Sequence, residues 1–145
     1  MGLDGVLGII VPISDEGAMH DVFHGKAVHA SLAPGASTNI EKGDRILFYD
    51  SGKSHNIVGE AVISDVAFEE AAKARHDHGA KLCVDGPDLD RFISSLPAGG
   101  ASVLRVLRFE EAVMYAQPVK CDQKIAEEGT YMTAQVFASI ARANA

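Results

Sequence analysis

Apolar residues along this chain switch between the spacing of strands and the spacing of helices. Residues 6–13 form a nearly continuous apolar run, which is typical of a strand buried on both faces. Ser14 can then cap a helix, which Gly25 ends. The apolar side of this helix consists of Met19, Val22 and Phe23. With a short strand at 26–32, the first part of the chain predicts a strand, a helix and a strand.

The middle of the chain predicts a β-hairpin. Gly43 and Asp44 favour a turn, and 45–49 alternates as a half-buried strand does. A polar loop at 50–55 leads into a second strand at 56–66. Two strands joined by so short a loop should pair antiparallel.

Helical and extended segments follow the hairpin. Residues 67–75 predict a helix with Phe68, Ala71 and Ala72 on one side, and a second helix runs from Pro87 to Leu96. Residues 102–115 predict a long strand, 117–129 a polar connection and about 130–143 a C-terminal helix. This order lacks the regular alternation of a doubly wound sheet and predicts an α+β fold.

Length and composition indicate one folded domain. The chain has 145 residues, of which 47% are hydrophobic and 23% charged, so 1–145 is expected to be a single domain. Its longest apolar run falls short of the roughly 20 residues that a membrane-spanning helix needs. The N-terminus lacks the basic region and cleavage site of a signal peptide. We therefore expect a cytoplasmic protein with no membrane partner.

Charge restricts a role in nucleic-acid binding. The net charge of −7 opposes phosphate binding over the whole surface. Four basic residues, Lys26, Lys42, Arg45 and Lys53, nevertheless fall in about the first third of the chain, whereas 60–90 is rich in acids. Nucleic-acid binding would need a local basic patch in that first third.

The predicted hairpin also resembles a known family. Its central stretches are Lys42-Gly43-Asp44-Arg45-Ile46-Leu47-Phe48-Tyr49-Asp50-Ser51-Gly52 and Ile57-Val58-Gly59-Glu60-Ala61-Val62-Ile63. They resemble the central hairpin of PUA-like domains, nearest to the ASCH and EVE branches and to an archaeal branch of that superfamily. Gly25-Lys26 matches a Gly-Lys element that those families carry after their first helix.

The resemblance covers about 5–115 and implies a small, mixed PUA-like β-barrel of about five strands, with flanking helices and the C-terminal helix outside it. Two positions depart from the family pattern. His29 and the residues around it stand where ASCH domains have an acidic and then a basic residue. Asp50 stands where EVE domains usually have His.

The same resemblance implies a binding site for RNA, single-stranded nucleic acid or a modified nucleobase, in a groove between the first helix and the barrel. The residues it places there are Lys26, His29, Tyr49, Ser51 and Lys53. Tyr49 would stack on a base, Ser51 and His29 would form hydrogen bonds, and the two lysines would contact phosphate.

Other chemistry has less support in the sequence. His20 and His24 share a helix face and His29 follows closely, but a catalytic zinc site normally needs a third ligand with an acid or base nearby, and no HExxH motif is present. His76-Asp77-His78 sits at a helix end, where a charged His favours the helix dipole, so we expect no metal and no cofactor. Some ASCH proteins hydrolyse acylated nucleosides with a lysine, a threonine and a glutamate. Lys26 and Glu60 could fill two of these places, but no Thr closely follows Lys26.

A non-catalytic binding domain is therefore the main hypothesis. The small amidohydrolase and a protein-interaction module, which would suit the acidic surface, remain as alternatives. The oligomeric state is left open.

Overall fold

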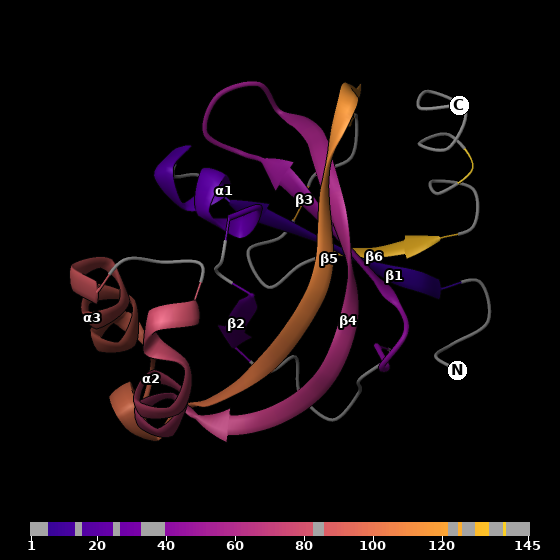
Figure 1. Cartoon of the computed structure of the whole chain (residues 1–145). Helices are drawn as coiled ribbons and strands as arrows, with labels where there is room; N and C mark the ends of the chain where they lie inside the picture. Colours follow the sequence, from indigo (N-terminus) through magenta and orange to yellow (C-terminus); the bar gives the residue numbers. More distant parts are fainter. Residues whose placement is uncertain are drawn as a thin grey trace.

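The computed structural model describes residues 6–13, 16–24, 27–32, 40–82, 86–121, 125, 130–133 and 138. They form one mixed sheet with helices at its sides and one end (Figure 1). The elements in order are β1 (Val6–Ile13), α1 (Glu16–Val22), β2 (Val28–Leu32), β3 (Arg45–Asp50), β4 (Asn56–Glu70), α2 (Ala71–His78), the short 3₁₀ helix η1 (Gly79–Lys81), α3 (Gly86–Ser95), the 3₁₀ helix η2 (Gly99–Ala101), β5 (Val103–Lys120) and β6 (Thr130–Thr133).

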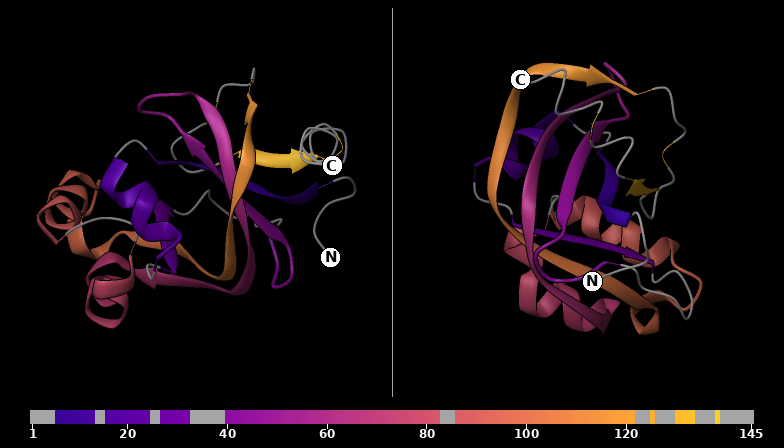
Figure 2. Two further views of the ribbon diagram at one scale, coloured as in Figure 1. Left: turned by 45° about the horizontal axis from the view of Figure 1, so that its top comes forward. Right: turned by 90° about the vertical axis from the view of Figure 1, so that its right-hand side faces the viewer.

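The sheet has six strands in the order β2-β5-β4-β3-β1-β6. β1 and β3 are parallel, and all other neighbours are antiparallel. β4 and β5 are the longest strands and curve across the whole molecule, with α2 and α3 gathered at one end of them (Figures 1 and 2). The predicted single α+β domain is confirmed, and the mixed sheet has six strands where the expected barrel had five or so.

The predicted hairpin is also confirmed. β3 and β4 pair antiparallel, with Ile46 opposite Ala61 and Phe48 opposite Gly59. The turn before β3 contains Gly43 in the left-handed region, at φ +97°, where glycine has no Cβ penalty. The N–H of Gly43 donates to the carbonyl of Ile63 at 2.8 Å, which ties the turn to β4.

The helix predicted at 67–75 starts later than expected, because β4 continues to Glu70. In this part of the strand, Ala67 pairs with Val106 and Phe68 with Arg105 of β5. This long-range pairing outweighs the local helical spacing. α2 begins at Ala71 and buries Ala71 and Ala74, whereas Phe68 stays largely exposed.

The C-terminal part differs from the prediction in two places. β5 runs to Lys120, so the predicted polar connection begins as strand. Residues Thr130–Thr133, predicted as the start of a helix, form β6 and pair antiparallel with β1, which extends the sheet beyond 115. Thr and Tyr favour strands, and β1 offers a free edge there. Of the residues after 133, the described part contains only Ala138, which is helical.

Two other predicted features, the helix cap at Ser14 and the helix end at Gly25, lie outside the described residues. In the described part of the chain, no helix is long and apolar enough to cross a membrane.

The main core lies on one face of the sheet and is closed by α1. Side chains of β1, β3, β4 and β5 form most of it. Met19 and Phe23 pack against it from the α1 segment, that is, from α1 together with the turn at 23–24 that follows it. The ring of Phe23 meets Phe48 edge-on, with ring centroids 5.6 Å apart. A Cβ on Gly59 would lie 2.5 Å from the Phe23 ring and 2.5 Å from the carbonyl oxygen of Val113. Gly59 therefore permits the close approach of the Phe23 ring to the sheet.

Two smaller clusters lie elsewhere. One, centred on Leu82, Leu89 and Leu104, packs α2 and α3 against the end of the sheet. The other contains Ile10, Leu47 and Ile57.

Two polar side chains are buried within the sheet. His29 on β2 is 8% exposed and Arg105 on β5 is 1% exposed. Burial, together with the positive charge of Arg105, lowers the pKa of His29 to about 4. The imidazole is therefore neutral in the folded protein at pH 7.

We predict that Gly59→Ala destabilises the protein, because the added methyl group must displace a backbone carbonyl and a packed ring. The expected loss is about 1–3 kcal/mol in the free energy of unfolding, measured by urea denaturation. The matched control is Gly79→Ala, since a Cβ at Gly79 meets nothing within 4 Å and its backbone is helical. A loss at Gly79 equal to that at Gly59 would contradict the packing argument.

We also predict that His29 makes stability depend on pH. Its pKa is 6.5 when unfolded and about 4 when folded, so only the unfolded chain takes up this proton between those values. The contribution of neutral His29 to the free energy of unfolding is therefore present in full above pH 6.5. It falls by about 3 kcal/mol on acidification to pH 4, because the unfolded chain is then stabilised by taking up the proton. His29→Gln should remove that part of the pH profile, whereas His76→Gln, at an exposed position, should leave it intact. Parallel profiles for wild type and His29→Gln would refute the prediction.

Candidate functional site

A cavity of about 590 Å³ lies between α1, the β3–β4 loop and the β4–β5 ribbon. We call it the α1 groove; its lining residues are Met19, His20, Asp50, Gly52, Lys53, Val58 and Met114. Met19, Val58 and Met114 make one part of the lining apolar. Met114 is 56% exposed, so its apolar side chain is open to solvent beside the cavity. The groove therefore combines apolar surface with ionisable groups.

Asp50 organises the loop that forms the polar side of the groove. Its Oδ1 accepts the N–H groups of Gly52 and Lys53 at 3.2 and 3.1 Å. Its Oδ2 accepts the N–H and the hydroxyl of Ser54 at 3.2 and 3.0 Å. Burial raises the pKa of Asp50, but the hydrogen bonds from Ser54, Lys53 and Gly52 outweigh it and hold the pKa below its ordinary value. The carboxylate thus fixes the backbone that carries Lys53.

Of the five residues expected at a binding site, Lys53 lines the α1 groove. Ser51 belongs to the same loop, and its N–H donates to the carbonyl of Ile13 at 3.2 Å. Tyr49 instead packs against the cluster of Ile10, Leu47 and Ile57. Its hydroxyl is hydrogen-bonded to Nδ1 of His55 at 3.2 Å. Neither Ser51 nor Tyr49 is among the lining residues of the groove.

His29 lies far along the sheet from Tyr49. It pairs with Leu107 on β5, whereas Tyr49 pairs with Ile57, which pairs with Val119 on β5. The structure therefore does not bring His29 and Tyr49 together. Lys26 lies outside the described residues.

Six lining residues were not predicted as site residues, namely Met19, His20, Asp50, Gly52, Val58 and Met114. The sequence pattern indicates core positions for Met19 and Val58, and both are partly buried and pack against the main core. His20 was considered only as a metal ligand. No sequence signal distinguishes Met114 from a buried strand residue, because its exposure depends on how the β4–β5 ribbon curves.

His20 and His24 stack with their rings nearly parallel, 4.0 Å apart between centroids. Nδ1 of His24 lies 2.8 Å from the carbonyl oxygen of His20 and can donate to it, and Nδ1 of His20 is 3.5 Å from the carboxylate of Asp21. Within the described ranges, these two histidines belong to no group of three metal-ligating side chains; such a group exists elsewhere, at Glu69, Asp77 and His78.

Glu60 takes part in an ion pair. Its carboxylate accepts a hydrogen bond from the guanidinium of Arg45 and one from the hydroxyl of Tyr115 at 3.0 Å. Burial, and then the negative charge of Glu60, raises the pKa of Tyr115. Glu60 pairs in register with Leu47, so it lies on the face of the second small cluster rather than on the α1 face. This geometry is that of a structural ion pair.

Solved structures of ASCH proteins share this fold. The ASCH protein from Zymomonas mobilis matches with a TM-score of 0.74 at 9% identity, over 96% of this chain and 96% of that chain. A serine-to-alanine mutant of it, ZmASCH, matches with a TM-score of 0.78 at 10% identity, over 97% and 99%. The resemblance to ASCH domains is therefore confirmed at the level of the fold.

The N-terminal domain of Staphylothermus marinus McrB is a more distant structural match. Its TM-score is 0.55 at 16% identity, over 98% of this chain and 99% of that chain. No curated protein matches in sequence. The model of the family described as Domain of unknown function (DUF365) matches residues 6–134, which is most of the chain. The chain therefore belongs to the DUF365 family and has the fold of ASCH-domain proteins.

Proposed function

We propose that this domain binds RNA, single-stranded nucleic acid or a modified nucleobase in the α1 groove, without catalysing a reaction. The observation that carries the proposal is the groove itself, which joins apolar surface to a lysine whose backbone is held by Asp50, beside the first helix. Its volume of about 590 Å³ is in the range of small-molecule sites. The resemblance to PUA-like families implies a ligand at this place, and the shared ASCH fold supports it.

The apolar lining suits the flat face of a base. Met19 and Met114 have flexible, polarisable side chains that make favourable contacts with aromatic rings. Val58 adds a stiffer, β-branched apolar side chain to the same lining. In this arrangement the methionines supply the contact with the base that Tyr49 was expected to supply by stacking.

The polar lining suits phosphate and the edge of a base. Lys53 is exposed and carries the positive charge that phosphate requires. His20 can donate or accept a hydrogen bond. Both oxygens of Asp50 are engaged by the loop, so Asp50 acts as a positioning residue. With so few cations, the affinity should be weak to moderate and its dependence on salt shallow.

The hydrolase alternative requires Glu60 to reach a substrate. Both oxygens of its carboxylate are hydrogen-bonded, one to Arg45 and the other to Tyr115. Glu60 also lies on the opposite face of the sheet from the α1 groove, which favours binding over this catalytic arrangement.

Lys53→Ala and Met114→Ala should separate the two kinds of contact. If Lys53 contacts phosphate, its loss should reduce the slope of log K against log salt by about one. Met114→Ala should weaken binding and leave that slope unchanged, because it removes only apolar contact. The measurement is a titration of short single-stranded RNAs and modified nucleosides, followed by NMR shifts at several salt concentrations.

The control for that titration is Lys81→Ala, which removes an exposed lysine on η1. It should change neither the affinity nor the slope. Shifts confined to residues away from the groove, or none with any ligand, would refute the proposal. Turnover of an acylated nucleoside that is lost in Glu60→Gln would establish the hydrolase instead.

Asp50→Ala should weaken ligand binding even though it removes a negative charge from the groove. The reason is that the loop loses the four hydrogen bonds that hold Lys53 in place. The control is Asp21→Ala, which removes a negative charge beside His20 without touching that loop and should leave binding equal or tighter. Tighter binding by Asp50→Ala would show that Asp50 acts through its charge and not as a positioning residue.

A further inference from the structure

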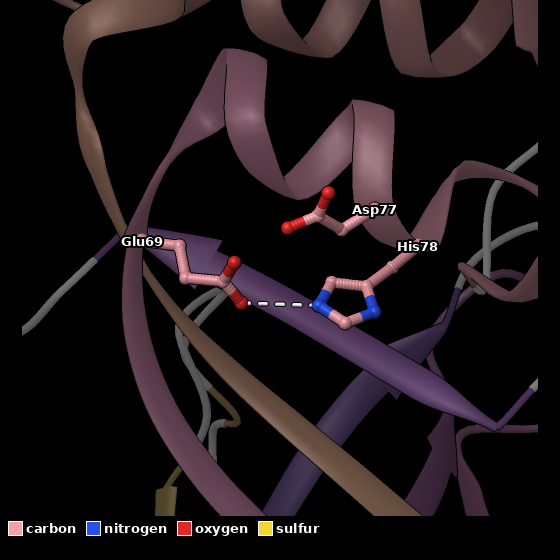
Figure 3. Close-up of side chains that lie close together, drawn as sticks. All are labelled: Glu69, Asp77 and His78. Carbon is pink, nitrogen blue, oxygen red and sulfur yellow. Dashed lines mark hydrogen bonds and ion pairs between the residues drawn. The ribbon is translucent and has the colours of Figure 1, made fainter.

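Outside the α1 groove, three metal-ligating side chains converge where β4 leads into α2. Glu69 comes from the end of β4, and Asp77 and His78 come from the last turn of α2 (Figure 3). One ligand atom from each lies within 4.8 Å of the other two. In the sequence, most of α2 separates Glu69 from the other two, so no short motif marks this group.

Two of the three side chains are largely withdrawn from solvent. The side chains of Glu69 and His78 are 11% and 17% exposed, and Nε2 of His78 lies 3.0 Å from Oε2 of Glu69. Ligand atoms bound about 2.1 Å from a tetrahedral zinc ion are roughly 3.3 Å apart. A zinc ion could therefore be bound by Glu69 and His78 together with little movement of either side chain.

A cation already compensates the two carboxylates. Nζ of Lys73 lies 3.6 Å from Oε1 of Glu69 and 3.9 Å from Oδ2 of Asp77. The Lys73 side chain is 68% exposed, and ion pairs this long and exposed contribute little to stability. The ammonium can swing into solvent and leave both carboxylates to a divalent ion, which has twice its charge.

The position in the fold also favours positive charge. The C-terminal end of a helix carries the negative end of its dipole, and Asp77 and His78 lie in that turn. The backbone of Glu69 is held by the sheet, because β4 pairs with β5 at this point and Glu69 lies opposite Leu104. The ligands thus come from two elements whose relative position the sheet already sets.

We propose that Glu69, Asp77 and His78 bind one first-row divalent transition-metal ion, of the class of Zn²⁺, with Lys73 as the competing cation. An imidazole nitrogen with two carboxylates suits zinc, cobalt or nickel better than Mg²⁺ or Ca²⁺, which prefer oxygen alone. Three protein ligands leave a coordination position for water. The bound ion would tie the end of α2 to β4. This proposal departs from the expectation from sequence that the chain holds no metal, and it is independent of the nucleic-acid proposal.

The test uses Zn²⁺ and, as a spectroscopic probe, Co²⁺. Both are titrated into the full chain carrying His20→Ala and His24→Ala, which removes the exposed histidine pair on the α1 segment. We expect one equivalent to bind, with visible Co²⁺ bands and a higher melting temperature. His78→Ala and Glu69→Gln should each weaken binding at least roughly tenfold, as much as the loss of an outer-shell partner costs in known sites.

Two variants distinguish a metal site from a network of ion pairs. His76→Ala changes an exposed histidine in the same turn and should leave binding unchanged. Lys73→Met should tighten metal binding several-fold, because it removes the competing ammonium group. Since Lys73 is exposed, this variant should fold and can test the proposal even if His78→Ala does not fold. Absence of saturable binding, equal loss in His76→Ala, or unchanged or weaker binding in Lys73→Met would overturn the proposal.

Discussion

The antiparallel pairing of β4 with β5 runs from Asn56 opposite Lys120 to Glu70 opposite Val103. Its register shifts at three places, between Ile57 and Gly59, between Glu60 and Val62, and between Ile63 and Asp65. Such irregularities bend a strand and increase its twist. The ribbon therefore curves instead of lying flat, and this curvature gives the sheet a face that α1 can close and an end that α2 and α3 can cover.

The α1 groove depends on this ribbon and on one glycine within it. Gly59 leaves room for the Phe23 ring directly against the sheet, and that contact sets how closely the α1 segment approaches. Val58 and Met114 lie next to this contact on β4 and β5, and Gly59 pairs with Met114. The same packing that completes the core thus leaves apolar side chains uncovered at the edge of α1.

The sequence predicted the local parts of this arrangement well. The strand at 6–13, the turn at Gly43 and the hairpin follow from patterns of a few residues, and each is present. The errors concern pairing between distant segments. Residues 67–70 have helical spacing but pair with β5, and 130–133 pair with the edge of β1. A local pattern carries no information on which distant strand will be available as a partner.

For the site residues too, the sequence indicated local features but not which distant segments come together. The polar stretch at 50–55 indicated a loop, and Lys53 does lie in the loop after β3, where it lines the α1 groove. Strand alternation shows that Tyr49 lies on the same face of the sheet as Leu47. It does not show which of the two faces α1 covers. The structure places both on the cluster of Ile10 and Ile57, away from α1. The groove residue Met114 could not be predicted, since its neighbours depend on the bends in the ribbon.

Charge at the groove differs from charge over the chain as a whole. The net charge is −7, yet the carboxylate of Asp50 is surrounded by donors from Gly52, Lys53 and Ser54. Donors that converge on a carboxylate offset part of its field, as backbone dipoles do at anion sites. The positive charge of Lys53 is consequently opposed less at the groove than the composition suggests. If the proposed nucleic-acid binding holds, this local offset is the reason that a phosphate group would be tolerated at the groove of a chain whose net charge is −7.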